Sequence, residues 1–349
     1  MSSYEIRTLT DADGAAWDAF VASHSVGNGM VTTSARQWWL SNRWFLHLVA
    51  AFEGSAIVAG AAVVTKKMPH LPWSLARMQA ILPDPRGVAE TTADLLRAVE
   101  ELARSERAAE IELRCAVPEG VALDGVEYGQ GICEALERAG YLDSGDAFET
   151  YIVDVNKDDA ALLATFEKEC RRQVRVGARK GVEVVESRSP EDFQAMVDAD
   201  ATLRERKQLP RYSPETYEGF RTMLAGGGLK LFLARYEGQP CNLSLIQPFG
   251  IPCMMLLAVT PYALEKGVPA TGEPFQYGAM KWFRDHGAAY YDLGGTPGAK
   301  PVKGHPNYTV WRFKYQFRGQ HVRYLPYYRR SLGIVGPWIV AAARRLGRL

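Results

Sequence analysis

The chain repeats one order of secondary-structure elements, and this duplication constrains its fold more than any short motif does. Each half contains a hairpin around a Glu-Gly turn, then a helical segment, then a strand. In the first half these segments are 48–52, 56–65, 91–104 and 109–114. In the second half they are 231–236, 241–247, 275–285 and 289–293. The pattern predicts one mixed α/β fold that is used twice.

The chain length agrees with two domains. Its 349 residues exceed what one hydrophobic core usually organises. A helix at 132–139 and a strand at 148–153 connect the halves, so we expect a first domain at 1–150 and a second at 151–325. Residues 326–349 are expected to form a C-terminal helix that packs back on the first domain. We expect a monomer.

Composition excludes several classes of protein. The net charge of +1 means that any nucleic-acid binding must come from a local patch. The five cysteines lack any C-x-x-C spacing, which favours a reducing cytoplasmic location over a disulfide or zinc framework and predicts no metal site. The first ten residues lack the apolar region of a signal peptide. The uncharged run 238–264 contains four prolines and is expected to form paired strands rather than a membrane span.

The order of hairpin, helix and strand resembles the acetyltransferase-like (GNAT-like) α/β fold, which binds acyl-coenzyme A. That fold holds the pyrophosphate on backbone N–H groups of a Gly-rich loop that opens the helix. The corresponding segments here are 83–87 and 266–270, which contain proline and no run of glycines. We therefore expect two tandem GNAT-like domains without the thioester donor. An acyl-CoA-dependent N-acyltransferase is the first alternative.

A basic segment at 168–180 is the clearest local charge feature. On a helix, five of its cations share one face because they lie three or four residues apart. They are Lys168, Arg171, Arg172, Arg175 and Arg179. A like-charged face favours an anionic partner, and the phosphates of an RNA would serve. The alternative is a solvated face that pairs with nearby acids such as Glu167 and Glu183.

Residues 289–330 combine a strand with an aromatic and basic segment. The strand Tyr290–Leu293 leads into Gly294-Gly295, and residues 311–319 then read Trp-Arg-Phe-Lys-Tyr-Gln-Phe-Arg-Gly. Interleaved aromatic rings and cations can hold a flat ring and a phosphate together. The segment therefore indicates a substrate that carries a nucleotide.

These features follow one another in an order that resembles the Fem-type peptidyltransferases. The order is the basic helix, Thr202-x-Arg204-x-Arg206, a helix start near Tyr212 and Tyr217, the second hairpin, Asp292-Leu293-Gly294-Gly295, and Phe313-Lys314-x-x-Phe317-x-Gly319. Members of that family use aminoacyl-tRNA and extend peptidoglycan stem peptides without the ribosome. The resemblance is strongest over 162–328, and the absence of a coiled-coil insertion resembles the compact, arm-less members. It implies transfer of an amino acid from charged tRNA to the amine of a peptide acceptor.

The resemblance also implies roles for residues of the second domain. An aminoacyl ester is already activated, so we expect neither a nucleophile nor a cofactor. Lys314 is implied at the tRNA phosphate and the reacting ester, where its charge would stabilise an oxyanion, and Phe313 would shape the aminoacyl pocket or stack on a base. The alternative places Phe313 in the core and Lys314 in solvent. Asp292 is expected to cap the Gly294-Gly295 turn beside the site, without a role in proton transfer.

The family implies acceptor contacts at two places. They are Arg36 and Arg43 beside Trp38-Trp39, and Arg211, Tyr212 and Tyr217 beside a helix start. These residue types suit a diphosphate. The strand 253–259 lacks the tyrosine expected in an acceptor cleft. The acceptor is therefore either a UDP-linked or lipid-linked peptidoglycan precursor, or an intermediate of a peptide natural product, as in antibiotic biosynthesis.

The last stretch of the chain combines apolar residues with arginines. They are Ile334, Val335, Trp338, Ile339, Val340, Arg344, Arg345 and Arg348. A basic amphipathic helix can contact a membrane surface, and the alternative is that it docks on the first domain. A second alternative for the whole protein is a non-catalytic RNA-binding module.

Overall fold

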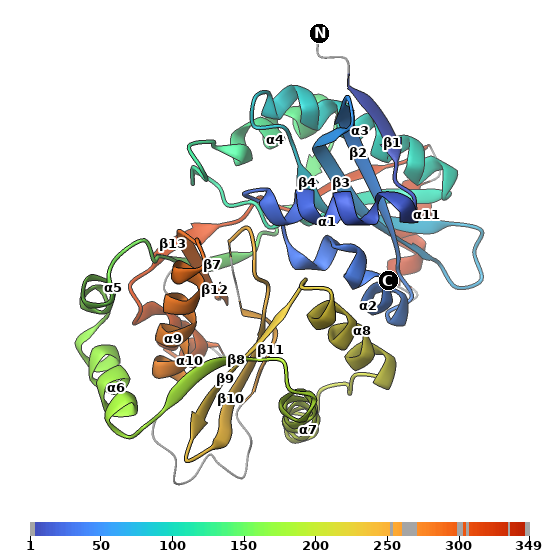
Figure 1. Ribbon diagram of the computed structural model, residues 1–349. Coiled ribbons are helices and arrows are strands. Elements are labelled where there is room, and N and C mark those ends of the chain that lie inside the picture. The colour runs from blue at the N-terminus through green and yellow to red at the C-terminus, as the bar shows by residue number, and fades with distance from the viewer. Residues whose placement is uncertain are drawn as a thin grey trace. The chain divides into compact units, whose positions relative to one another are not determined.

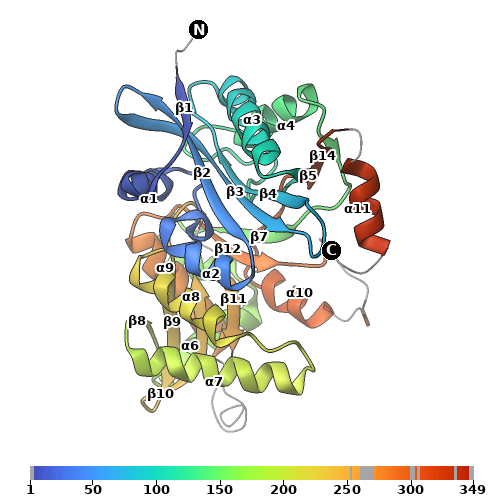
Figure 2. The same ribbon diagram turned by 90° about the vertical axis from the view of Figure 1, so that its right-hand side faces the viewer.

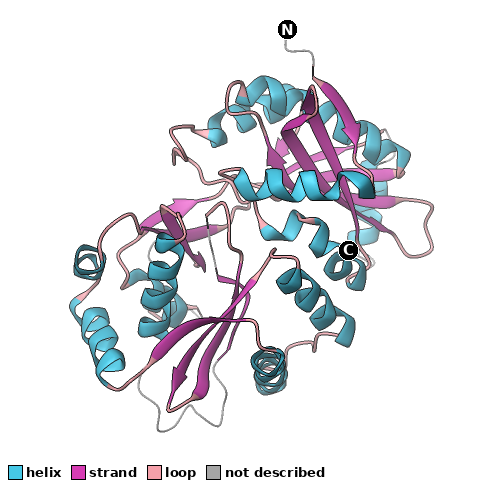
Figure 3. Cartoon of the chain, in the orientation of Figure 1, coloured by secondary structure: helices cyan, strands magenta, loops and turns pink. Residues whose placement is uncertain are grey.

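The computed structural model describes residues 4–251, 254–259, 271–298, 303–304, 307–333 and 336–345. The chain divides into two compact units, which Figures 1 and 3 display. The first unit contains Met1–Phe148 and Arg323–Leu349, and the second contains Glu149–Val322. The boundaries expected from the sequence, 150 and 325, lie near these. Residues 326–349 do not form a helix alone. The strand Tyr328–Ser331 joins the sheet of the first unit, and the expected C-terminal helix follows it.

The first unit is built on a mixed sheet. Its elements are β1 (Glu5–Thr8), α1 (Gly14–Ser23), α2 (Arg36–Ser41), β2 (Phe45–Glu53), β3 (Ala56–Lys67), β4 (Ser74–Leu82), α3 (Val88–Ser105), β5 (Ala108–Leu113), α4 (Tyr128–Arg138), β6 (Leu142–Asp143), β14 (Tyr328–Ser331) and α11 (Gly336–Arg345). The strand order is β1-β2-β3-β4-β5-β14-β6. Strands β4 and β5 are parallel, and the other pairs with a described register are antiparallel.

Helices α3 and α4 lie side by side in this unit, as Figure 2 shows. The buried side of α3 presents Leu95, Leu96 and Val99 at helical spacing to the strands beneath it. Trp17 of α1 is fully buried, and its indole N–H donates to the Val31 carbonyl oxygen at 2.8 Å. Gly60 of β3 makes room for this ring, because a Cβ there would lie 2.4 Å from it.

The second unit contains two smaller sheets. Its elements are β7 (Glu149–Asp154), α5 (Asp159–Thr165), α6 (Lys168–Arg179), β8 (Glu183–Ser187), α7 (Pro190–Arg206), α8 (Pro214–Ala225), β9 (Lys230–Tyr236), β10 (Gln239–Ile246), β11 (Met254–Val259), α9 (Gly272–Asp285), β12 (Tyr290–Gly295), α10 (Tyr308–Tyr315) and β13 (Gln320–Arg323). The sheets have the orders β11-β10-β9-β8 and β12-β7-β13. Figure 1 shows α6 and α9 on one side of the first of these sheets and α7 on the other.

Local sequence explains where the helices of the second unit begin and how closely they pack. Helices α7 and α8 both start with Ser-Pro-Glu, and Ser189 and Ser213 accept backbone N–H groups of the first turns. Gly177 of α6 permits close approach to α9, since a Cβ there would lie 2.4 Å from Pro274. An aromatic core that includes Phe166 and Phe317 joins these helices to the sheets.

The predicted duplication and tandem GNAT-like class are confirmed. The first unit runs β2-β3, β4, α3, β5, and the second runs β9-β10, β11, α9, β12. One difference between the units is that β4 pairs with β5 whereas β11 and β12 belong to different sheets. The longest helices in the described ranges are α3 and α7, of 18 and 17 residues, so those ranges contain no coiled-coil arm. None of the described helices is both long and apolar enough to span a bilayer.

Candidate functional site in the second unit

Lys314 lies on α10, and its side chain is buried rather than exposed to solvent. Trp311, one turn earlier, donates its indole N–H to the hydroxyl of Tyr151 at 3.0 Å and holds the helix against β7. The Lys314 side chain is 9% exposed, and its ammonium group donates to the carbonyl oxygen of Gly295 at 2.6 Å. The alternative of a solvent-facing lysine is therefore wrong.

Phe313 is half-buried beside the start of α9. Its ring contacts Phe317 edge-on, with the centroids 5.4 Å apart. Gly272 opens α9 at this point, and a Cβ there would lie 3.0 Å from the Phe313 ring. Neighbouring positions of α10 thus supply an aromatic surface and a buried cation, the two groups that the sequence predicts for this segment.

Asp292 lies inside β12, where the pairing with β7 is irregular between Asp292 and Gly295, so the cap expected from the sequence forms within the strand rather than at a turn after it. Its Oδ1 accepts the backbone N–H of Gly294 at 2.6 Å, and it also contacts the hydroxyl of Thr150. Gly294 has a φ of +76°, which favours glycine, and the carbonyl oxygen of the next residue, Gly295, accepts the bond from Lys314. The buried carboxylate therefore orders the Lys314 environment through the backbone.

Glu167 connects the Lys314 segment to the basic helix. Its backbone N–H donates to the carbonyl oxygen of Gln316 at 2.9 Å. Its carboxylate pairs with Arg312 at 2.6 Å and with Arg318 at 2.7 Å. Because these arginines come from α10 and the residues just after it, Glu167 does not neutralise α6. Glu167 is therefore not the acid that pairs with the basic face, but the alternative of a solvated face with acidic partners stays open, since Arg172 pairs with Glu169.

The basic face of α6 exists as predicted. Its five cations line one surface hollow together with Glu169 and Ala178. Arg172 pairs with Glu169 at 2.6 Å, and Arg171 donates to the Phe166 carbonyl oxygen at 2.5 Å. Bonds from Arg172 and Gln173 lower the pKa of Glu169 to about 2. The other three cations, Lys168, Arg175 and Arg179, have no ion-pair partner among the described side chains.

Two of the three predicted acceptor residues of the second unit, Tyr212 and Tyr217, belong to one local network with Arg204 and Asp200. The ring of Tyr212 lies 3.5 Å beneath the guanidinium of Arg204, and the hydroxyl of Tyr217 donates to Asp200 at 2.7 Å. Burial and the bond to Asp200 raise the pKa of Tyr217, which therefore stays protonated at neutral pH. Arg211 is exposed and pairs with Glu205 at 3.1 Å.

The predicted acceptor residues of the first unit lie at the two ends of α2. Arg36 begins the helix and pairs with Asp11, and Arg43 follows the helix with a φ of +63°. Trp39 between them is buried and donates to the Met30 carbonyl oxygen at 2.7 Å. The segment that lacks the expected tyrosine contains β11, and residue 253 and the side chains of 254–257 lie outside the described residues.

The loop that would hold a CoA pyrophosphate in the first unit is occupied by Asp84. This buried carboxylate accepts the Arg86 backbone N–H at 2.9 Å, and the Gly87 N–H donates to the Asp84 carbonyl oxygen at 3.1 Å. The Arg86 guanidinium outweighs burial and lowers the pKa of Asp84, which keeps it ionised. Negative charge and occupied amides at this position oppose pyrophosphate binding. The corresponding segment 266–270 lies outside the described residues.

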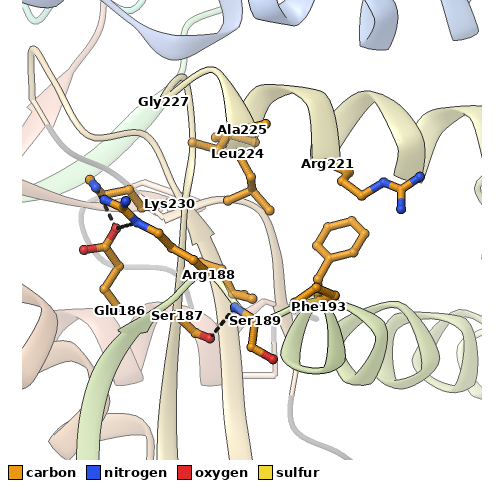
Figure 4. Close-up of a pocket in the computed structure, with 13 residues that line it drawn as sticks. Glu186, Ser187, Arg188, Ser189, Phe193, Arg221, Leu224, Ala225, Gly227 and Lys230 are labelled. Carbon is orange, nitrogen blue, oxygen red and sulfur yellow. Dashed lines mark hydrogen bonds and ion pairs between the residues drawn. The ribbon is translucent and has the colours of Figure 1, made fainter.

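A separate pocket of about 370 Å³ lies in the second unit between the start of α7 and the end of α8 (Figure 4). Lys230 pairs with Glu186 at 2.7 Å on one side, while Phe193 and Arg221 stand on the other. None of the predicted site residues lines it. The sequence does not indicate this pocket. Its walls come from segments around residues 187 and 225, and these two segments share no motif.

No family model matches the chain. A lipid II:glycine glycyltransferase from Staphylococcus saprophyticus is 23% identical over 380 aligned positions, which cover 89% of this chain and 89% of that protein. The crystal structure of FemX superimposes with a TM-score of 0.79 at 19% identity and covers 97% of this chain and 99% of that one. A tandem GNAT protein from the clavulanic acid biosynthesis pathway gives a TM-score of 0.52 at 14% identity, covering 95% and 99%.

These similarities show that the chain has a tandem GNAT-like fold. Its resemblance to the Fem-type family, predicted from the sequence, is confirmed, and the chain is Fem-like in both sequence and fold.

Proposed function

We propose that the protein is an aminoacyltransferase that moves an amino acid from charged tRNA to the amine of a peptide acceptor. One observation carries the proposal. Glu167, at the start of the basic helix α6, bonds to Gln316 and Arg312, which flank the buried Lys314 in the sequence, so the basic face and Lys314 are connected within one unit. The sequence likeness to lipid II:glycine glycyltransferases over most of the chain supports the same reaction class.

The proposed chemistry requires positioning and charge more than a nucleophile. The acceptor amine attacks the ester carbonyl of the aminoacyl group, an amide bond forms, and the 3′-terminal ribose oxygen of the tRNA leaves with a proton. Negative charge develops on the carbonyl oxygen during attack, and the Lys314 ammonium would stabilise it. We propose no cofactor and no metal, since aminoacyl-tRNA is itself the activated co-substrate.

RNA binding is assigned to the basic face. Lys168, Arg175 and Arg179 are exposed cations without acidic partners in the described structure, so tRNA phosphates would supply their counter-charge. Phe313 would meet the aminoacyl side chain or the terminal base. The alternative of a non-catalytic RNA-binding module would explain the basic face, but it would not explain why Lys314 is buried.

The acceptor is proposed to be a peptidoglycan precursor, because relatives are named for lipid II. A peptide natural-product intermediate is the second possibility for the same site. We assign acceptor binding to Arg36, Arg43, Arg211, Tyr212 and Tyr217 as the sequence predicts. The acyl-CoA alternative is opposed by the ionised Asp84 in the loop before α3.

Membrane contact through α11 and a cytoplasmic location belong to the same proposal. Ile339 and Val340 pack on Met68, Trp73 and Leu75 of the first unit, so these two apolar side chains of the helix are used internally. Trp338 remains 76% exposed and is the side chain that would reach a lipid surface.

The test is transfer of labelled amino acids from a pool of charged tRNAs to lipid II, to its UDP-linked precursor and to a free pentapeptide, with and without ribonuclease. Ribonuclease-sensitive product would establish the donor and reveal the amino acid. A parallel reaction with acetyl-CoA tests the rival. Turnover of acetyl-CoA with no product from any charged tRNA would overturn the proposal.

A further inference from the structure

His321 of β13 and Glu149 of β7 are bonded to each other on the small sheet of the second unit. Nε2 of His321 lies 2.8 Å from Oε2 of Glu149. The strands β13, β7 and β12 lie side by side in this sheet (Figure 1). Among the described histidines, only His321 bonds a carboxylate, because the ring contacts of the others are to backbone groups or to a hydroxyl. We call these two residues the His-Glu pair.

The His-Glu pair has the arrangement of a general base. The Glu149 carboxylate accepts the N–H at Nε2, so the lone pair of the neutral ring lies on Nδ1. Nδ1 has no bonding partner among the described residues and can therefore take up a proton. The side chains of His321 and Glu149 are 29% and 32% exposed, so a substrate can reach them.

One peptide unit connects the His-Glu pair to Lys314. The carbonyl oxygen of Gly295 accepts the Lys314 ammonium at 2.6 Å, and the Thr296 N–H of the same peptide unit donates to the Glu149 carbonyl oxygen at 2.8 Å. The ammonium therefore lies within about 8 Å of that oxygen. The Glu149 carboxylate points toward the same segment, since a Cβ at Gly298 would lie 3.5 Å from its Oε2. A buried cation and a basic ring thus border one short segment.

Tyr151 orients the imidazole ring and also contacts α10. The rings of Tyr151 and His321 meet edge-on, with their centroids 5.4 Å apart. Trp311 of α10 donates its indole N–H to the Tyr151 hydroxyl at 3.0 Å. One tyrosine on β7 therefore packs against both the imidazole and the helix that carries Lys314. Burial raises the pKa of Tyr151, which stays protonated at neutral pH.

The charged and titratable groups around the His-Glu pair come from three elements. Tyr151 is the group on β7. On β13, Arg323 lies two residues after His321 and pairs with Glu119 at 3.6 Å. On α10 they are Lys314 and Tyr315, whose ring lies 6.1 Å from that of Tyr151. These residue types do not ordinarily change charge between about pH 5 and 8, whereas histidine does.

We propose that His321, held by Glu149, is the catalytic base that takes the proton of the attacking amine. This inference rests on the proposed function, because it concerns the same transfer. The acceptor amine loses a proton to Nδ1 as its nitrogen bonds to the ester carbon. The imidazolium then gives that proton to the 3′-ribose oxygen as the C–O bond breaks, and the ring ends neutral. Glu149 stabilises the imidazolium in between, while Lys314 stabilises the oxyanion.

The test is the pH dependence of single-turnover transfer at saturating charged tRNA and acceptor. The wild-type rate should rise and then level off between about pH 5 and 8, the range in which histidine loses its charge. His321→Gln should be slower by about 10²–10⁴-fold and should lack the plateau. Glu149→Gln should be slower by a smaller factor. Its inflection should move to lower pH, because the carboxylate no longer favours the imidazolium.

Two further variants separate a catalytic role from a structural one, after thermal unfolding has established that each variant folds. The matched control is His286→Gln, an exposed histidine of the same unit that contacts the Trp282 carbonyl oxygen at 2.7 Å. This control should keep the wild-type rate and pH profile. Added imidazole should restore part of the transfer in His321→Ala and none in Lys314→Met, since a free base replaces only a missing base.

The inference and the proposed function fail in different ways. If His321→Gln transfers at the wild-type rate with the same pH profile, His321 is not the base although the reaction stands. If His321→Gln is slower but keeps the wild-type profile, and imidazole restores nothing to His321→Ala, the His-Glu pair is structural and the inference is wrong. If the wild type transfers no amino acid from any charged tRNA, the proposed function fails and the inference fails with it.

Discussion

Neutralising the basic face of α6 should weaken tRNA binding in a salt-dependent way. The variant is Arg175→Gln with Arg179→Gln, which removes two exposed cations that have no acidic partner in the described structure. Each cation that neutralises a phosphate adds about 1 to the slope of log K against log salt concentration. The double variant should therefore reduce the magnitude of that slope by about 2, and binding should weaken most at low salt.

Arg172 provides an internal comparison on the same helix. Its guanidinium is partly committed to Glu169 at 2.6 Å. Arg172→Gln should therefore cost less tRNA affinity than Arg175→Gln. Glu169→Gln should increase affinity, because it frees Arg172 and removes a negative charge from the face.

The assay is fluorescence anisotropy with a labelled tRNA at several salt concentrations. The control is Arg138→Gln on α4 of the first unit, an exposed guanidinium paired with Glu134 at 3.3 Å, which should leave the slope unchanged. An unchanged slope in the double variant would refute the reasoning. So would an equal loss in the control, since this would indicate a general charge effect.

Three further predictions follow from contacts in both units. Thr150→Val removes a donor from the buried Asp292 carboxylate, which should cost about 1–3 kcal/mol and lower the melting temperature by several degrees, measured by calorimetry. Trp338→Ala should reduce co-sedimentation with anionic vesicles if α11 contacts lipid, and equal sedimentation would exclude that role. Bonds from Arg172 and Gln173 lower the pKa of Glu169 to about 2, so their stabilisation is present above about pH 4.5 and disappears as the pH falls toward 2. In Arg172→Gln the Glu169 carboxyl should titrate at higher pH by NMR.

The fold was predictable because its signals are local. Hairpins around Glu53-Gly54 and Glu237-Gly238 need only alternation and a turn, and both occur. The five cations of α6 lie on one face because helical spacing alone determines that. By contrast, β14 was not predicted, because a four-residue strand between β5 and β6 is specified by partners more than 180 residues away in the sequence.

The site was predictable in residue type but not in its contacts. The sequence marks Lys314 and Asp292, yet the roles of Glu167 and Thr150 depend on residues that are distant along the chain. The same holds for Glu149 and His321, which lie 172 residues apart in the sequence and meet because β7 and β13 are neighbours in one sheet. Spacing rules describe one helix or strand at a time and contain no information on such pairings.

The proposed reaction requires that charged tRNA is the donor and that Lys314 supports the transfer step. The most direct test is a single-turnover reaction in which excess enzyme is mixed with tRNA charged with a labelled amino acid and with the acceptor, for wild type and Lys314→Met. Thermal unfolding first establishes that the variant folds, since it loses the bond to Gly295. Transfer in the variant should be slower by about 10²–10³-fold at saturating tRNA. An unchanged transfer rate in a folded variant, or no transfer by the wild type from any charged tRNA, would contradict it.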